Sequence, residues 1–163
     1  MRAKSGSRKR TFSYAQFRQI TDLSKKEADG WVSRGIIRAD LSGDGRRRIY
    51  DYNSLMEGNI AKQVADFASR QLLQRMMEGF HKFVDTEKLN LEEIGPIGER
   101  RLVKLYTRKS KESLPGGGVR GVIPYVLWFD PSDITRVQKG VFLVVDLTEM
   151  ALEVMQALQH LSD

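Results

Sequence analysis

Two N-cap signals, Ser13 and Ser24, lie close together near the N-terminus, so the helix between them can have only a few turns. Ser13 precedes the apolar-periodic stretch YAQFRQI, and Ser24 precedes KKEADGWVSRG, with Glu27 three residues later. Serine followed at that spacing by glutamate is a capping box, which satisfies free amide groups in the first turn of a helix. The second helix is expected to end at Gly35. Because only ITDLS lies between the two helices, the sequence predicts a helix–turn–helix.

The stretch after the second helix is typical of a β-hairpin. Ile36 and Ile37 lead into a turn built on SGDG, and RRRIYD leads out of it. Glycine supplies the tight tip of such a turn. Successive residues of a strand point to opposite faces, so Arg46 and Arg48 are expected on one face and Arg47 on the other. A hairpin directly after a helix–turn–helix is a wing.

A long helical pattern follows the hairpin, with Asn53 as its expected N-cap. Its apolar residues recur at steps of three and four in two runs, first Leu55, Met56, Ile60, Val64 and Phe67, and after a break Leu73, Met76, Phe80 and Phe83. Residues 71–89 are therefore predicted to form a connecting helix with an apolar stripe. The stripe either packs on the C-terminal part of its own chain or pairs with a second subunit. We favour pairing, with a dimerisation seam of Leu73, Met76, Phe80 and Phe83.

Residues 90–163 predict a small α+β domain. The segments VIPYVLWFD and VFLVVDL are apolar, β-branched and aromatic, and we expect them to pair as strands, whereas RRLVKLYTRK fits either a strand or a helix. The closing stretch LTEMALEVMQALQHL predicts a final helix that starts near Asp146 and Glu149. The whole chain is thus expected to have an α+β fold, with a winged helix–turn–helix, a long connecting helix and this C-terminal domain.

The inventory of residues argues against an enzyme. The chain has no cysteine, which excludes disulfides, thiolate nucleophiles and cysteine-ligated metals and favours an intracellular location. No signal peptide and no apolar run of membrane-spanning length is evident, so a cytoplasmic protein without a membrane partner is expected. The loop GGGVRG at 116–121 lacks the lysine and the hydroxyl of a phosphate-cradling loop. We expect no catalytic residue, metal or cofactor, since the remaining candidates fit surface, core, turn or cap positions: His81, His160, Asp130, Asp133 and Asp146.

Positive charge is concentrated in the first part of the chain. Residues 1–70 contain 15 Lys and Arg against 8 Asp and Glu, whereas residues 71–163 contain 12 against 13, within a formal net charge of +6. Concentrated cations suit a polyanion, although the same composition also fits a surface that only keeps the protein in solution. Residues 1–10, MRAKSGSRKR, have no apolar periodicity and predict a flexible basic arm.

Residues 11–70 resemble the MerR-type winged helix, a bacterial DNA-binding module. The resemblance covers FSYAQFRQITDLSKKEADGWVSRGIIRAD followed by RRRIYDYNSL, and its main features are Phe12-Ser13, Leu23-Ser24, Trp31, Gly35, Arg47 and Tyr50. The chain departs from the family at Asp29-Gly30, where an arginine commonly precedes the aromatic residue, and at Trp31, where the aromatic residue is commonly tyrosine. A tryptophan there also resembles the module in excisionases and in small subunits of phage terminases. Residues 90–163 carry no such resemblance.

The resemblance implies a sequence-specific regulator of bacterial or phage type that binds double-stranded DNA. A recognition helix reads base edges in the major groove, so Lys25 and Lys26 are candidates for guanine or phosphate contact. Asp29 is expected to pair with a neighbouring lysine, and Trp31 to lie in the core. The resemblance assigns DNA-backbone contacts to Arg47 and Tyr50. The full set of expected DNA-binding residues is Ser13, Tyr14, Lys25, Lys26, Arg34, Arg38, Arg46, Arg47, Arg48 and Tyr50.

Two other functions fit the same sequence. One is a phage DNA-packaging protein, similar to a terminase small subunit, or an excisionase-like recombination accessory protein; the other is an enzyme that carries a DNA-targeting module. A regulator should form a homodimer on a two-fold site, whereas a packaging subunit should form a higher ring. Further candidate partners of a regulator are RNA polymerase and a small-molecule effector.

Overall fold

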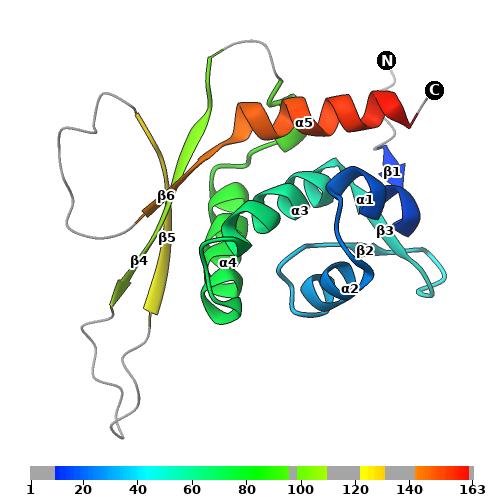
Figure 1. Cartoon of the computed structure of the whole chain (residues 1–163), viewed down its shortest axis with the longest axis horizontal. Helices are drawn as coiled ribbons and strands as arrows, with labels where there is room; N and C mark the ends of the chain where they lie inside the picture. The colour runs from blue at the N-terminus through cyan, green and yellow to red at the C-terminus, as the bar shows by residue number, and fades with distance from the viewer. Residues whose placement is uncertain (1–9, 96–98, 110–121, 131–141, 162–163) are drawn as a thin grey trace, which may run out of the picture.

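Figure 1 shows the computed structural model of the chain, which describes residues 10–95, 99–109, 122–130 and 142–161. This part of the chain contains five α-helices and two antiparallel three-stranded sheets, so the expected α+β class is confirmed. Within these residues, no helix combines the length and the apolar character needed to cross a bilayer.

The N-terminal segment forms two short helices, as predicted, and a small sheet. Its elements are β1 (Thr11–Phe12), α1 (Tyr14–Thr21), α2 (Lys25–Ser33), β2 (Asp40–Leu41) and β3 (Arg48–Asp51). Ser13 and Ser24 each form a complete capping box, and Trp31 is buried as expected. After α2 the chain turns through Gly35, whose φ of 69° is accessible to glycine without strain.

The sheet order is β1-β3-β2. The strands of this sheet correct two details of the sequence-based prediction. Residues Thr11–Phe12 form a strand against β3, with Phe12 opposite Tyr50, which the sequence did not predict. The second strand of the hairpin begins only at Arg48, so Arg46 and Arg47 lie in the turn. The alternation of faces expected for residues 46–48 therefore does not apply, because it requires all three residues to lie in a strand.

The long helical pattern is divided into two helices, α3 (Tyr52–Ala65) and α4 (Arg70–Thr86). The N-cap of α3 is Asp51 and not Asn53, because the Asp51 carboxylate accepts from the amide of Ser54 while the Ser54 hydroxyl accepts from the Asp51 amide. Ser69 caps α4. Phe67 lies between the helices and is exposed, so it is not part of the apolar stripe.

The predicted dimerisation seam lies in the core of a single chain. Leu73, Met76 and Phe80 on α4 are buried, and the half-buried Phe83 contacts Trp128 edge to face, with 5.2 Å between ring centroids. The prediction of a seam is therefore wrong, because these side chains already pack on the C-terminal part of their own chain. This packing does not test oligomerisation through another surface.

The C-terminal segment contains the second sheet and the last helix: β4 (Leu102–Lys109), β5 (Val122–Trp128), β6 (Phe142–Asp146) and α5 (Leu147–His160). The sheet order is β5-β4-β6. The two strongly apolar segments therefore do not pair with each other as expected, since both pair with β4, where Val103 and Leu105 are fully buried. Asp146 caps α5, as the sequence predicted.

Helix α3 lies at the centre of the molecule. It packs against α1, α4, α5 and the short 3-10 helix Leu91–Glu93, and α5 also contacts α1 (Figure 1). The buried apolar residues form one core cluster that extends from Phe12 to Leu158. The core therefore continues across residues 70 and 90, where the sequence suggested domain boundaries.

Candidate nucleic-acid interface

Residues from three separate parts of the chain meet around a surface hollow of about 440 Å³. The start of α1, one residue of α2 and the β2–β3 hairpin supply its lining, which is Ser13, Tyr14, Asp29, Arg46, Arg47, Arg48 and Tyr50. We call this hollow the arginine concavity. It brings together most of the side chains that the sequence suggested for DNA binding. Its three arginines outnumber its single aspartate, so the excess of positive charge suits an anionic ligand.

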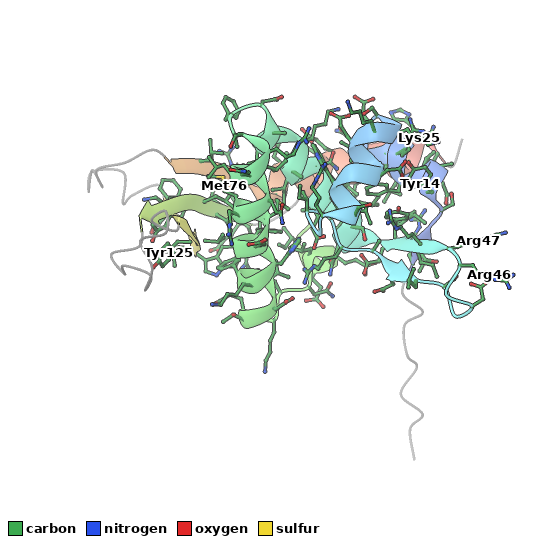
Figure 2. All side chains as sticks on the ribbon, turned by 90° about the horizontal axis from the view of Figure 1, so that it is seen from below. Tyr14, Lys25, Arg46, Arg47, Met76 and Tyr125 are labelled. Atoms are coloured by element: carbon green, nitrogen blue, oxygen red, sulfur yellow. The ribbon has the colours of Figure 1, made fainter. Side chains whose placement is uncertain are left out.

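The hairpin tip is fixed by hydrogen bonds among its own residues. The Ser42 amide donates to the Arg47 carbonyl oxygen at 2.7 Å, and the Arg47 amide donates to Ser42 Oγ at 3.0 Å. The Asp44 carboxylate accepts from the Ser42 hydroxyl and from the Arg46 amide, and these bonds hold the pKa of Asp44 below its usual value. Gly45 has a φ of 68°, a conformation strained for other residues. The tip therefore presents Arg46 and Arg47 to solvent (Figure 2).

A hydrogen bond between side chains joins α1 to α2 at the edge of the concavity. The Tyr14 hydroxyl donates to Asp29 Oδ1 at 2.7 Å. Burial, together with this bond, raises the pKa of Tyr14 to about 12, so the phenol remains protonated at neutral pH. The expectation that Asp29 pairs with a lysine is wrong, because the carboxylate is bonded to this tyrosine. Asp29 is thus held by a neutral donor within a basic surface.

Tyr50 lies beneath the arginines. Its side chain is fully buried, and its ring stacks on Phe17 with 4.2 Å between centroids, so the expected exposed contact is corrected to a core position. Tyr50 is one of the residues around the concavity, but its hydroxyl is buried and has no hydrogen-bond partner of good geometry among the described residues. Burial raises the pKa of Tyr50, although the nearby positive charge of Arg48 opposes the rise.

The exposed side of α2 extends the positive surface. Lys25 and Lys26 occupy its first turn, Arg34 caps its C-terminal end, and all three side chains are exposed. Arg48 of the hairpin reaches Ser33 Oγ at 3.5 Å, which links the hairpin to α2. Figure 2 places these elements at one end of the molecule, as its labels show for Tyr14, Lys25, Arg46 and Arg47.

Arg38 belongs to a different site. Its Nε donates to Glu57 Oε1 at 2.8 Å, its backbone amide donates to Glu57 Oε2 at 2.7 Å, and its Nη1 pairs with Asp85 Oδ1 at 2.8 Å. Burial alone would lower the pKa of Arg38, but the charges of Glu57 and Asp85 raise it above its usual value. Arg38 therefore lies outside the arginine concavity, and its guanidinium joins the segment after α2 to α3 and α4.

Sequence reasoning missed Glu57 and its contact with His81. Glu57 is fully buried, and Nε2 of His81 on α4 lies 3.4 Å from its Oε2. The signal was present, because Glu57 directly follows Met56 within the apolar pattern of α3. A carboxylate at such a position is rarely buried without a cation, so it could have pointed to a partner such as Arg38.

The other residues considered for catalysis or metal binding form no second site within the described part of the chain. Among the described residues, no group of three or more His, Asp or Glu side chains is placed to hold a metal ion. Asp146 accepts from the amides of Thr148 and Glu149 as the cap of α5 and also pairs with Arg100. Residues 1–9, 116–121 and Asp133 lie outside the described residues.

No protein-family model matches this chain, and no curated protein matches its sequence.

Proposed function

We propose that this chain is a sequence-specific double-stranded DNA-binding transcriptional regulator of bacterial or phage type, in which α1, α2 and the β2–β3 hairpin act as a winged helix–turn–helix. The observation that carries the proposal is the convergence of Arg46, Arg47 and Arg48 with the start of α1 around the arginine concavity. Duplex DNA presents closely spaced phosphates, and arginines that neutralise them release condensed counterions. A basic hollow beside an exposed basic helix suits such a ligand.

Helix α2 is the element suited to reading base edges. An α-helix fits the major groove, and its first turns reach the bases most directly. Lys25 and Lys26 are exposed in this first turn, where each can donate to guanine or to phosphate. The capping box at Ser24 and the turn at Gly35 fix both ends of the helix, so its side chains start from a defined position.

The hairpin and the concavity supply backbone contacts in this proposal. Arg46 and Arg47 project from a tip that is already ordered by its own hydrogen bonds. Contacts of this kind fix the orientation of the protein on the duplex, while base contacts provide specificity.

The test is the replacement Arg47→Glu, with Arg70→Glu as a control that makes the same charge change on α4. We expect Arg47→Glu to weaken binding to all duplexes by a similar factor, since the contact is to phosphate. The slope of log K against log salt concentration should become shallower by about one unit for the lost phosphate contact. Fluorescence anisotropy of labelled duplexes over a range of salt concentrations measures both quantities.

The control separates a local contact from a general charge effect. Arg70→Glu should leave the slope close to that of the unchanged protein, because Arg70 lies at the start of α4, outside the residues that line the concavity. Equal effects of the two variants, or an unchanged affinity for Arg47→Glu at every salt concentration, would remove the concavity from the interface. Absence of duplex binding by the unchanged protein would refute the proposed function.

A further inference from the structure

Asp29 is the only anion among the described residues that line the arginine concavity. A surface that bound phosphate alone would gain from a neutral or cationic side chain at this position, because a carboxylate repels phosphate. An ionised carboxylate only accepts hydrogen bonds, so it is suited to a ligand that offers a donor. The place of Asp29 therefore favours a ligand that carries hydrogen-bond donors as well as phosphates.

We propose that Asp29 determines part of the base specificity of this chain by accepting a hydrogen bond from the N4 amino group of a cytosine in the major groove. The inference rests on the proposed function, in which α2 lies in that groove. Base pairs present two donors there, the N4 amino group of cytosine and the N6 amino group of adenine. Adenine carries the N7 acceptor beside its amino group, which would repel a carboxylate, whereas the groove edge of cytosine carries no acceptor. Cytosine is therefore the base that fits Asp29.

Asp29 lies on the side of α2 that a groove would meet. Lys26 precedes Asp29 by three residues and Ser33 follows it by four, so the three side chains share one side of the helix. Lys26 and Ser33 are exposed, whereas Ala28 and Trp31 are buried in the core. A duplex on this side of α2 would thus meet an acceptor between a cation and a hydroxyl group.

The Asp29 carboxylate is held in place with one oxygen still available. The Tyr14 hydroxyl donates to Oδ1 at 2.7 Å, and within the described part of the chain no hydrogen bond or ion pair involves Oδ2. Because the donor is neutral, the negative charge remains, and a charged acceptor forms a stronger hydrogen bond than a neutral one. A side chain already ordered by such a bond loses less entropy when it binds a base.

Gly30 leaves room for α2 to approach the base edges closely. A Cβ atom added to Gly30 would meet the Arg34 side chain, with Nη1 at 3.1 Å, and no core residue of the described chain. Core packing therefore does not require glycine at this position, although glycine within a helix is less stable than alanine. Since the side chain of aspartate is short, Asp29 reaches a base only where the helix backbone lies near it. The absence of a side chain at Gly30 permits that approach.

Selection of binding sites from duplexes with a random central segment tests the inference on the full chain. The unchanged protein should enrich cytosine at one position, with discrimination of about tenfold against other bases. Asp29→Asn should lose this preference and favour adenine there, because an amide can donate to N7 and accept from N6. The remaining positions of the site should stay the same.

Glu27→Gln is the matched control, because it removes the same charge from the same helix. Glu27 accepts from the Ser24 amide at 2.9 Å, and glutamine can replace it in this capping box. We expect Glu27→Gln to select the same site as the unchanged protein. If Asp29 acted only by repelling phosphate, both variants would bind all duplexes more tightly and keep that site. An unchanged site for Asp29→Asn, or the same altered site for both variants, overturns the inference.

A second measurement uses the unchanged protein, so it does not depend on how a variant folds. N4-methylcytosine at the selected position lacks the amino hydrogen that faces the major groove but still pairs with guanine. Fluorescence anisotropy should show a loss of affinity of about tenfold for this duplex. Asp29→Ala should discriminate much less between the two duplexes, and an equal loss in both proteins overturns the inference.

The outcomes for the inference and for the proposed function differ. A protein that binds no duplex would refute the proposed function, and the role of Asp29 would fall with it. A protein that selects a site without regard to Asp29 would overturn the inference alone and leave the proposed function standing. Selection of adenine by the unchanged protein, at the position that Asp29→Asn alters, would overturn the assignment to cytosine.

Discussion

The hydrogen bond between Tyr14 and Asp29 helps to fix how α1 packs against α2. The phenol lies in the first turn of α1 and the carboxylate lies in α2, so their 2.7 Å hydrogen bond fixes one helix against the other. Asp29 also lines the arginine concavity, where an anion would repel phosphate. The bond from Tyr14 holds this carboxylate in one position without adding a positive charge.

Replacing Tyr14 with phenylalanine should remove the most alkaline tyrosine transition of the protein. The pKa of Tyr14 is about 12 in the folded chain, above its ordinary value of 10.0, because the group is partly buried and donates to Asp29. With a raised pKa, its contribution to stability is complete below about pH 10 and is lost as the pH rises through 12. We expect Tyr14→Phe to flatten this alkaline loss and to lower the stability at pH 7 by about 1 kcal/mol.

Absorbance of tyrosinate near pH 12 and urea unfolding between pH 7 and pH 11 measure these two effects. Tyr125→Phe is a suitable control, because Tyr125 is partly exposed and lies in the C-terminal sheet. If the most alkaline transition persisted in Tyr14→Phe, its assignment to Tyr14 would be wrong.

The sequence predicted residue types at the candidate site better than it predicted their directions. The exposure of Arg46 and Arg47 follows from the glycine-tipped turn, which is a local signal. The partners of Tyr50 and Arg38 were not predicted, because they come from distant parts of the chain. Tyr50 stacks on Phe17, and Arg38 meets Glu57 and Asp85, and these partners have no signature in the local sequence.

At the scale of elements, the contact between α1 and α3 is set by a glycine. A Cβ atom added to Gly58 would lie 2.8 Å from Cγ2 of Thr21 and 3.4 Å from Cε2 of Phe17. Thr21 has little freedom to move, because its side chain is buried and its hydroxyl donates to the Phe17 carbonyl oxygen at 2.8 Å. The two helices therefore approach closely only where α3 has no side chain.

Gly58→Ala should destabilise the fold although alanine favours helices. The gain in helix propensity is at most about 1 kcal/mol, and overpacking in a dense core costs about 1–3 kcal/mol. In a Thr21→Ser background, which removes Cγ2 and keeps the hydroxyl, the same change should cost much less. Chemical unfolding of the two single variants and the double variant measures this coupling. A Gly58→Ala protein more stable than the unchanged chain would contradict the close contact.

The sequence predicted where helices begin better than it predicted which strands pair. The caps at Ser13, Ser24 and Asp146 were correct, because a cap is specified by residues within one turn. The order β5-β4-β6 was missed, since two apolar strands offer equally good faces and the sequence does not show which strand is central. The pairing of β1 with β3 was missed for a similar reason, because two residues carry no periodicity.

At the scale of the whole molecule, α3 and α5 join the two ends of the chain into one core. Helix α5 is the last described element, and it packs on α1 and α3 near the N-terminus. Residues 1–70 alone would therefore expose the side of α3 that α4 and α5 cover. An isolated N-terminal module, suggested by the sequence, loses part of its core in this arrangement.

The two tryptophans allow a test of whether the two ends of the chain unfold together. Trp31 lies in α2 and Trp128 lies in β5, so Trp31→Phe and Trp128→Phe leave one fluorescent reporter at each end. Because the core is continuous, the normalised unfolding curve followed by Trp31 should coincide with the curve followed by circular dichroism, and the same should hold for Trp128. A reporter that changes at a lower urea concentration than circular dichroism in the same variant would show that the ends unfold separately.

The self-contained hydrogen bonding of the hairpin tip has a consequence for how this protein can change. Ser42, Asp44 and backbone groups hold the tip in shape, and the side chains of Arg46 and Arg47 take no part in those bonds. Exposed side chains of this kind can usually be replaced with a change in stability of about 0.5 kcal/mol or less. Selection could therefore alter what these two positions bind while the fold stays intact, so the tip is a place where new ligand preferences can evolve at little thermodynamic cost.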